Sequence, residues 1–120
     1  ERGMEDALTR AFAYVEAGAD GIMIHSRKKT ADEIIEFCDK FRAKYSDIPI
    51  VVVPTSYNYI TEAELAAHGV NIVIYANQLT RSAFPAMENT AKEILKNHRA
   101  LEVDSKLMPF KDIITLIDEL

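Results

Sequence analysis

The feature that most constrains the fold is a repeated order of elements: an amphipathic helical stretch, a short β-branched apolar run, and a polar turn. Apolar runs at 21–24, 50–53 and 70–75 each follow a helical pattern, and no hairpin dipeptide joins them. Strands that alternate with helices pair in parallel through right-handed crossovers. The sequence therefore predicts an α/β fold with about three parallel strands.

Apolar spacing and capping residues predict the first two helices. The helix at 4–17 should end at Gly18, because glycine adopts the left-handed backbone that commonly follows a helix C-terminus. The next helix should begin after Thr30 and end near Tyr45. Glu33 stands three residues after Thr30, which is the spacing of a capping box. We expect these two residues to cap that helix reciprocally.

The same signals predict three helices in the second half of the chain. Thr61 and Glu64 have capping-box spacing at the start of a short helix. A long helix is expected at 79–98, interrupted or bent near Pro85, because proline removes a backbone donor and crowds the preceding turn. A last helix is expected at 109–120, with a proline in its first turn. The polar stretch between these two helices is not predicted to be a domain boundary.

Composition excludes several functional classes. Apolar residues make up 48% of the chain and charged residues 28%, the balance of a globular domain. The net charge is −5, and the basic cluster at 27–29 is too short for a phosphate-binding stripe, so no nucleic-acid partner is expected. No apolar run approaches the roughly 18 residues of a membrane span. We therefore expect no membrane partner.

The chain has a single cysteine, Cys38. It cannot form an internal disulfide or contribute to a cysteine-rich metal site, which is typical of a protein in the reducing cytoplasm. Cys38 lies in a helical stretch, where a packing role is the expected one.

Polar residues follow each predicted strand, at the end where parallel α/β folds bind ligands. His25 and Ser26 come after the first strand, Thr55 after the second and Asn77 after the third. An imidazole and a hydroxyl can donate hydrogen bonds to a phosphoryl or carboxylate group, and the basic cluster at 27–29 adds positive potential nearby. This arrangement indicates an anion site centred on His25.

Each of these residues also has a plain structural interpretation. His25 can satisfy a buried backbone group, and Thr55 and Asn77 are residue types that start turns for conformational reasons. The aromatic loop at 57–59 can cover a pocket or pack against a neighbouring loop or subunit.

No glycine-rich phosphate loop, nucleophile elbow or zinc-binding spacing occurs. No pair of carboxylates stands convincingly at strand ends, and the acidic residues of the first half are interpreted as helix faces and caps. These are Asp20, Asp32, Glu33, Glu36 and Asp39.

Four segments together resemble the phosphoenolpyruvate mutase family of the isocitrate lyase superfamily. Residues 17–29 are similar to its sixth-strand region, 51–57 to the seventh strand and loop, and 72–81 to the eighth. Residues 103–114 are similar to its closing segment. The resemblance implies that residues 1–120 are the C-terminal part of a (β/α)8 TIM-type barrel, with about three strands and a C-terminal helix.

The resemblance also implies an activity: isomerisation of phosphoenolpyruvate and phosphonopyruvate, as in phosphonate biosynthesis. His25 is then the catalytic residue that binds the migrating phosphoryl group, supported by Ser26. The substrate-binding set comprises His25, Ser26, Thr55 and Asn77. Such enzymes use Mg²⁺, whose ligands come from earlier strands. No metal ligand is expected in this chain, which alone should be inactive.

Two alternatives stay open. The same segments fit phosphonopyruvate hydrolase or another isocitrate lyase superfamily member, and a non-catalytic binding or assembly module would keep the anion pocket without the reaction. The resemblance further implies three expectations about partners and location. The chain should need the N-terminal half of a barrel as a partner, form a homo-oligomer by exchange of the helix at 109–120, and reside in the cytoplasm.

Overall fold

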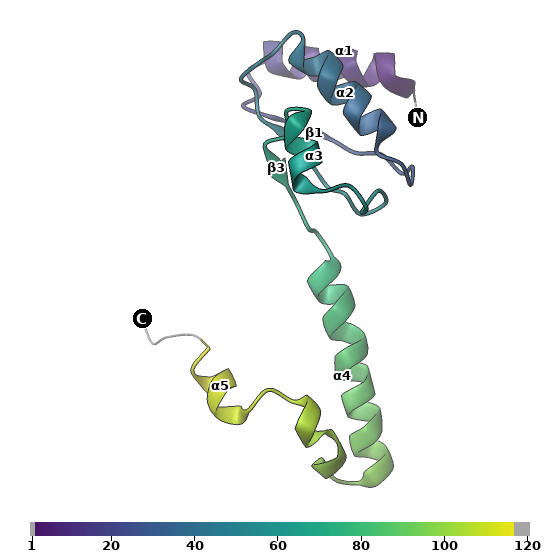
Figure 1. Ribbon diagram of the computed structural model, residues 1–120, viewed down its shortest axis with the longest axis vertical. Coiled ribbons are helices and arrows are strands. Elements are labelled where there is room, and N and C mark those ends of the chain that lie inside the picture. Colours follow the sequence, from purple (N-terminus) through teal and green to yellow (C-terminus); the bar gives the residue numbers. More distant parts are fainter. Residues whose placement is uncertain (1, 117–120) are drawn as a thin grey trace. The chain divides into compact units, whose positions relative to one another are not determined.

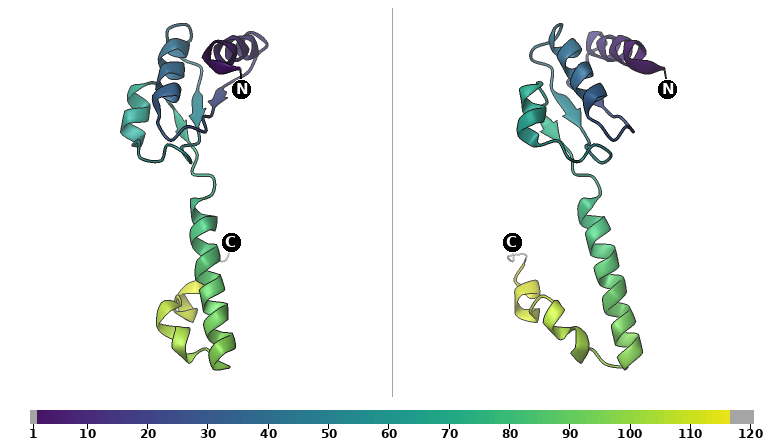
Figure 2. Two further views of the ribbon diagram at one scale, coloured as in Figure 1. Left: turned by 90° about the vertical axis from the view of Figure 1, so that its right-hand side faces the viewer. Right: turned by 45° about the vertical axis from the view of Figure 1, so that its right-hand side comes forward.

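The chain divides into two compact units, Glu1–Asn77 and Gln78–Leu120. The computed structural model describes residues 2–116. Figures 1 and 2 show the α/β elements of the first unit and the helical elements of the second. The first unit comprises α1 (Gly3–Glu16), β1 (Ile22–Ile24), α2 (Asp32–Arg42), β2 (Ile50–Val52), α3 (Glu62–Ala67) and β3 (Ile72–Val73). The second comprises α4 (Gln78–Asn97), the 3₁₀ helix η1 (Leu101–Lys106) and α5 (Phe110–Ile114).

The three strands form one parallel sheet in the order β1-β2-β3. Met23 pairs with Val51, and Val51 pairs with Ile72. Sequential order with parallel pairing is the pattern of a (β/α) barrel segment, because a doubly wound sheet reverses its strand order at a switch point. The prediction of about three parallel strands is confirmed.

The two faces of the sheet differ in burial. Ile50 and Val52 have no exposed surface and lie on the face covered by helices, whereas Met23 is 59% exposed and Ile72 is 48% exposed. Successive strand residues point to opposite faces, so Met23 and Ile72 belong to the same face. Within residues 2–116 this second face is therefore apolar and only partly covered.

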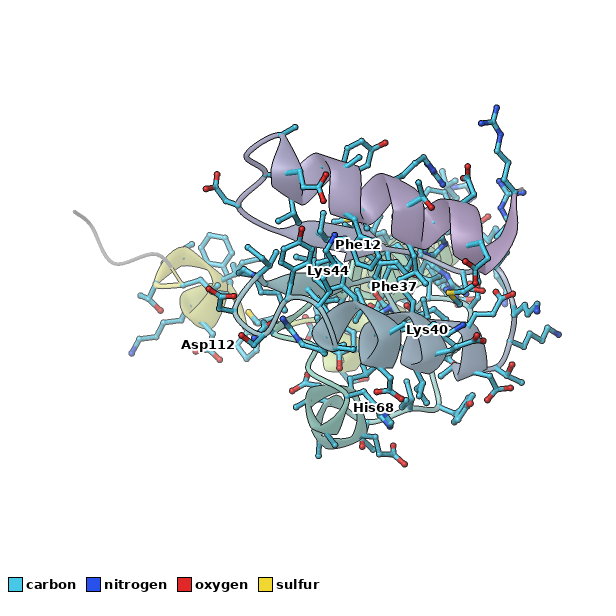
Figure 3. All side chains as sticks on the ribbon, turned by 90° about the horizontal axis from the view of Figure 1, so that it is seen from above. Phe12, Phe37, Lys40, Lys44, His68 and Asp112 are labelled. Atoms are coloured by element: carbon cyan, nitrogen blue, oxygen red, sulfur yellow. The ribbon has the colours of Figure 1, made fainter. Side chains whose placement is uncertain are left out.

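The core of the first unit lies mainly between α2 and its neighbours. Phe37 and Phe41 of α2 are fully buried, with ring centroids 5.7 Å apart, and Phe12 of α1 stacks on Phe41 at 5.9 Å. The Lys44 ammonium lies 4.5 Å from the Phe12 ring centroid, a cation–π contact at the margin of the core. Figure 3 shows Phe12 and Phe37 between the two helices.

Arg42, at the end of α2, ties together the loops that precede β2 and β3. Its guanidinium donates to the backbone carbonyls of Tyr45, Ile48 and Gly69 and to the Asn71 side chain. Gly69 has a φ of +83°, and a Cβ there would lie 2.5 Å from the Arg42 Nε, so both the backbone and the contact require glycine. One side chain thus satisfies several loop carbonyls that lack strand partners.

Two predicted helix ends are confirmed. After α1, Gly18 has a φ of +99°, Gly18 N–H donates to Val15 and Ala19 N–H donates to Tyr14, which is a Schellman motif. At α3, the Thr61 hydroxyl accepts from Glu64 N–H while the Glu64 carboxylate accepts from Thr61 N–H. Both motifs are local, so sequence spacing was sufficient to find them.

The predicted capping box of α2 is wrong. The N-cap residue is Ala31, which has no side-chain oxygen, and its N–H donates to the Tyr59 hydroxyl at 3.0 Å. Glu33 instead bonds Ser26 and pairs with Lys28. An ammonium and a hydroxyl offer this carboxylate stronger hydrogen bonds than a neutral backbone amide does.

In the second unit the predicted interruption near Pro85 is also wrong, because α4 runs as a single helix through that residue. Proline removes one backbone donor, and the remaining bonds of a long helix are retained. The last predicted helix is shorter: α5 spans Phe110–Ile114, with Pro109 as its N-cap residue. Residues 117–120 of that prediction lie outside the described residues.

None of the helices within residues 2–116 combines the length and the apolar composition that a bilayer crossing requires.

The contribution of Tyr57 to the stability of the core can be tested by substitution. Its side chain is fully buried, and its hydroxyl has no hydrogen-bond partner among the described residues. Burial raises the pKa of Tyr57 to about 12. A buried hydroxyl without a partner costs about 1–3 kcal/mol, so Tyr57→Phe should raise the free energy of unfolding by about 1 kcal/mol.

Tyr57→Ala is the matched variant, because it removes the ring as well and should lower the free energy of unfolding by about 3–5 kcal/mol. Urea denaturation followed by circular dichroism measures both changes. A Tyr57→Phe protein less stable than the parent by more than about 1 kcal/mol would show that the hydroxyl has a stabilising partner.

Candidate functional site

The C-terminal ends of the three strands lie at one edge of the sheet, because the strands are parallel. Thr55 follows β2 and Asn77 follows β3, and the Asn77 Nδ2 donates to the Thr55 Oγ1 at 3.4 Å. This is a long hydrogen bond, and both side chains are half-buried. The structure therefore brings Thr55 and Asn77 together, 22 residues apart in the chain.

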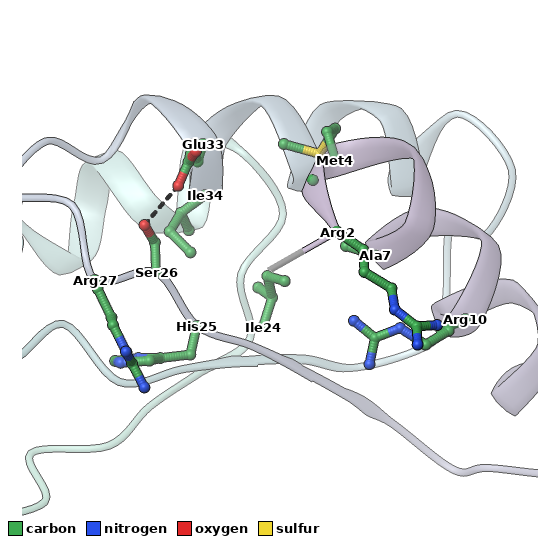
Figure 4. A pocket seen from close by; sticks show the side chains of 11 residues that line it. Arg2, Met4, Ala7, Arg10, Ile24, His25, Ser26, Arg27, Glu33 and Ile34 are labelled. Carbon is green, nitrogen blue, oxygen red and sulfur yellow. Dashed lines mark hydrogen bonds between the residues drawn. The ribbon is translucent and has the colours of Figure 1, made fainter.

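His25 and Ser26 line a cleft between α1, the end of β1 and the start of α2 (Figure 4). The cleft has a volume of about 250 Å³. Its other lining residues are Arg2, Gly3, Met4, Ala7, Arg10, Ile24, Arg27, Glu33 and Ile34. Neither Thr55 nor Asn77 belongs to this lining. The four predicted site residues thus fall into two pairs within the described structure.

Three arginine side chains line the cleft: Arg2, Arg10 and Arg27. Asp6 accepts from Arg10 at 2.8 Å and lies 3.9 Å from Arg2, so one negative charge faces two guanidiniums. The hydrogen bond from Arg10 to Asp6 and the charge of Asp6 raise the pKa of Arg10. Lys28 pairs with Glu33 at the same end of the sheet. The cleft thus gathers basic side chains although the whole chain carries a net charge of −5.

His25 and Arg27 are both exposed and line the cleft, and Figure 4 labels both side chains. Both side chains project to the same side of the loop, away from Ser26. An imidazole and a guanidinium that line one cleft can donate hydrogen bonds to the oxygens of a phosphoryl or carboxylate group. The geometry thus supports the predicted anion-binding role at the end of the first strand.

Ser26 is the buried polar residue of the first unit, with 7% of its surface exposed. Its hydroxyl donates to the Glu33 Oε2 at 2.7 Å and accepts from the Lys28 N–H at 3.1 Å. The Lys28 Nζ lies 2.6 Å from the other oxygen of Glu33. Hydrogen bonds from Lys28 and then Ser26 hold the pKa of Glu33 below its usual value. The carboxylate is therefore ionised in this arrangement.

Arg2, Arg10 and Glu33 line the cleft but are not among the site residues that the sequence predicts. Glu33 was assigned to a helix cap because only its spacing to Thr30 was considered. Its spacing to Lys28 was the available signal, since a basic residue close before a helix can pair with a carboxylate in the first turn. Arg2 and Arg10 lie on α1, and no sequence motif connects that helix to the loop after β1.

The loop at 57–59 packs against its neighbour, which was one of the two predicted alternatives. Tyr57 is fully buried, and the exposed Tyr59 accepts a hydrogen bond from Ala31 N–H. Cys38 is also fully buried, and burial raises its thiol pKa to about 11, so the predicted packing role fits its surroundings.

Residues that hold a divalent cation would be expected as a cluster of carboxylates, histidines or cysteines. Across residues 2–116, no three such side chains lie close enough together to bind a metal ion.

Relatives of known sequence include both candidate activities. The chain is 44% identical over 115 residues to a phosphonopyruvate hydrolase of Variovorax sp. strain Pal2, covering 95% of this chain and 39% of that protein. It is 41% identical to a phosphoenolpyruvate phosphomutase of Streptomyces viridochromogenes, covering 96% of this chain and 36% of that protein. The chain thus spans under two fifths of these relatives.

Solved structures support the fold. A phosphoenolpyruvate phosphomutase of Streptomyces platensis subsp. rosaceus matches with a TM-score of 0.87 at 34% identity, over 94% of this chain and 38% of that one. A phosphonopyruvate hydrolase in complex with oxalate and Mg²⁺ matches with a TM-score of 0.84 at 43% identity, over 95% and 40% respectively. These matches confirm the predicted fold class, an α/β portion of a larger barrel.

The family comparison covers most of the chain. Residues 1–95 match the profile of the family described as phosphoenolpyruvate phosphomutase. This range includes the cleft, both pairs of predicted site residues and all three strands. On this evidence the chain belongs to the phosphoenolpyruvate phosphomutase family.

Proposed function

We propose that the complete protein is an isomerase that interconverts phosphoenolpyruvate and phosphonopyruvate. In the forward direction the bond from phosphorus to the enol oxygen breaks and a bond from phosphorus to carbon forms, so no water is consumed. The observation that carries the proposal is the cleft at the end of β1, which His25 and three arginine side chains line in a chain of this family.

The charges of the cleft suit such a substrate. Phosphoenolpyruvate carries a phosphoryl group and a carboxylate, and three arginine side chains line the cleft together with His25. His25 is proposed as the catalytic residue, because donors placed before the reaction stabilise charge that spreads over the phosphoryl oxygens during transfer. Thr55 and Asn77 are proposed to contact the substrate from the neighbouring strands, with Ser26 in support of His25.

Phosphonopyruvate hydrolysis is the second candidate, favoured by the 44% identity to a hydrolase. In that reaction water adds to phosphorus, the carbon–phosphorus bond breaks, and the carbon takes a proton to give pyruvate and inorganic phosphate. The same cleft binds the same substrate in both cases. A non-catalytic anion-binding or assembly module is the third alternative, and it predicts binding without turnover.

We also propose that the complete protein uses Mg²⁺ and resides in the cytoplasm, without nucleic-acid or membrane partners. The related hydrolase whose structure contains Mg²⁺ supports the metal. Its ligands are proposed to come from residues outside 2–116, a range in which no cluster of three metal-binding side chains occurs. The N-terminal half of a barrel is the proposed source of these ligands, and residues 1–120 as one barrel portion would be inactive without it.

The first test is the fate of phosphonopyruvate. With the complete protein and Mg²⁺, we expect its ³¹P signal to be replaced by that of phosphoenolpyruvate, without accumulation of inorganic phosphate. Time-resolved ³¹P NMR resolves the three species in one sample. Inorganic phosphate as the product would identify the hydrolase, and an unchanged spectrum with measurable substrate binding would identify the non-catalytic module.

The second test concerns His25. Replacing His25 with alanine should lower kcat by about 10²–10³-fold, the usual effect of removing one donor that stabilises transition-state charge. His68→Ala is the control, because this histidine contacts Asp39 and does not line the cleft. Its kcat should stay within about twofold of the parent, as for surface changes remote from the chemistry. Equal losses in both variants would contradict the assignment.

Exposed apolar side chains of the second unit support a homo-oligomer. Among its described residues Val103 is the buried one, whereas Leu79, Leu95 and Phe110 are each at least 73% exposed. A unit with so little buried surface gains little stability from its own core, and extensive exposed apolar surface marks an interaction site. We propose that the segment at 109–120 is exchanged between copies of the protein.

Introducing charge into α5 tests this exchange. Ile113→Glu with Ile114→Glu should reduce the native mass to that of a monomer, because two carboxylates would be buried in the interface without partners. Thr115→Glu is the control, since this residue is polar and adjacent. Light scattering coupled to gel filtration measures the mass. An unchanged oligomer in the double variant would rule out α5 as the exchanged element.

A further inference from the structure

Three residues after β1 form a closed set of contacts, which we call the Ser26 bracket: Ser26, Lys28 and Glu33. The Ser26 hydroxyl donates to one oxygen of Glu33 at 2.7 Å, and the Lys28 ammonium lies 2.6 Å from the other. The Lys28 backbone N–H donates back to the Ser26 hydroxyl at 3.1 Å. The bracket thus joins the loop after β1 to the first turn of α2.

The hydrogen-bonding capacity of Ser26 decides what it can do for an anion. A serine hydroxyl has one proton to donate, and the phosphoryl group of a substrate offers only acceptors at neutral pH. That proton is given to Glu33, and the side chain is nearly fully buried. While the bracket holds, Ser26 cannot donate to a phosphoryl oxygen, so its influence on the cleft must pass through Glu33.

Figure 4 shows how the bracket affects its neighbours. Ser26 points toward Glu33 on α2, whereas His25 and Arg27, the residues directly before and after it, point together to the other side. A contact that fixes the Ser26 side chain therefore also restricts the directions of the His25 and Arg27 side chains on either side of it. The 3.0 Å bond from Ala31 N–H to Tyr59 holds the far end of the same loop.

Charge balance makes Glu33 compatible with this position. A carboxylate that lines an anion-binding cleft repels the anion unless it is neutralised. The Lys28 ammonium contacts Glu33 directly, so the pair presents little net charge to the cleft. Glu33 can therefore serve as an anchor without cancelling the attraction exerted by His25 and Arg27.

We propose that Glu33 is a positioning residue, which holds His25 and Arg27 in the cleft by anchoring Ser26 and Lys28. The proposal rests on the function proposed above and adds to it a residue that does not touch the substrate. It also assigns Ser26 to positioning rather than to direct contact with the phosphoryl group.

Glu33→Ala in the complete protein is the main test, with phosphonopyruvate as substrate. Displacing a reacting group by about 1 Å costs roughly 10²-fold, so we expect kcat to fall about 10- to 100-fold with KM changed less than about threefold. Glu36→Ala is the matched control. It also removes an ion pair between a glutamate of α2 and a lysine, since Glu36 pairs with Lys40 at 2.7 Å, but Glu36 does not line the cleft. Its kcat should stay within about twofold.

Two further variants separate positioning from other roles. Glu33→Gln keeps an oxygen that accepts from Ser26, so it should recover most of the kcat lost in Glu33→Ala. Ser26→Ala combined with Glu33→Ala should be no worse than the more severe single variant, because both remove the same contact. Effects that multiply in the double variant, or a loss in Glu33→Ala expressed in KM alone, would overturn the proposal.

The ¹⁵N signals of the His25 imidazole make the proposal testable independently of turnover. The parent protein and Glu36→Ala should each give one set of His25 ring signals, whereas Glu33→Ala should give shifted or broadened ones. The thermal unfolding of Glu33→Ala and Glu36→Ala should match. If the parent lacks activity on either substrate, the proposed function fails while this measurement still applies. Unchanged His25 signals in Glu33→Ala would overturn the positioning role.

Discussion

The site depends on one constraint, the parallel pairing of three successive strands in chain order. Parallel pairing places the residue after each strand at the same edge of the sheet, so His25, Thr55 and Asn77 reach one end of the unit without any local motif that joins them. Antiparallel pairing of β2 would send Thr55 to the opposite end. The hydrogen bond between Thr55 and Asn77 is direct evidence of this placement, since it links residues that follow different strands.

Polar side chains then fix the loops at both ends of the sheet. At the end away from the cleft, Arg42 bonds carbonyls of the loops before β2 and β3, which sets where those strands begin. At the cleft end, Tyr59 and Glu33 hold the loop after β1. Loop backbone needs such partners because its carbonyls and amides have no strand opposite. The direction of His25 is thus determined by contacts from α2 and from the loop after β2.

Sequence patterns predicted the parts of this structure that arise from local interactions. The Gly18 terminus and the Thr61 capping box depend on residues within one or two helical turns, and both were found from spacing alone. The start of α2 was not found from spacing, because the Ala31 amide there donates to the Tyr59 hydroxyl, 28 residues away in the chain. The cleft was predicted in part: His25 was identified from its place after a strand, whereas Arg2 and Arg10 required the packing of α1 beside β1 to be known.

The two units differ in what their own residues can stabilise. The first buries aromatic and aliphatic side chains of α1 and α2 against one face of the sheet, yet its other face, with Met23 and Ile72, is only partly covered within residues 2–116. The second buries Val103 and leaves most of its large apolar residues exposed. Both surfaces carry apolar side chains, whose removal from water lowers the free energy. Covering either surface would therefore add stability that the described residues of the two units do not supply by themselves.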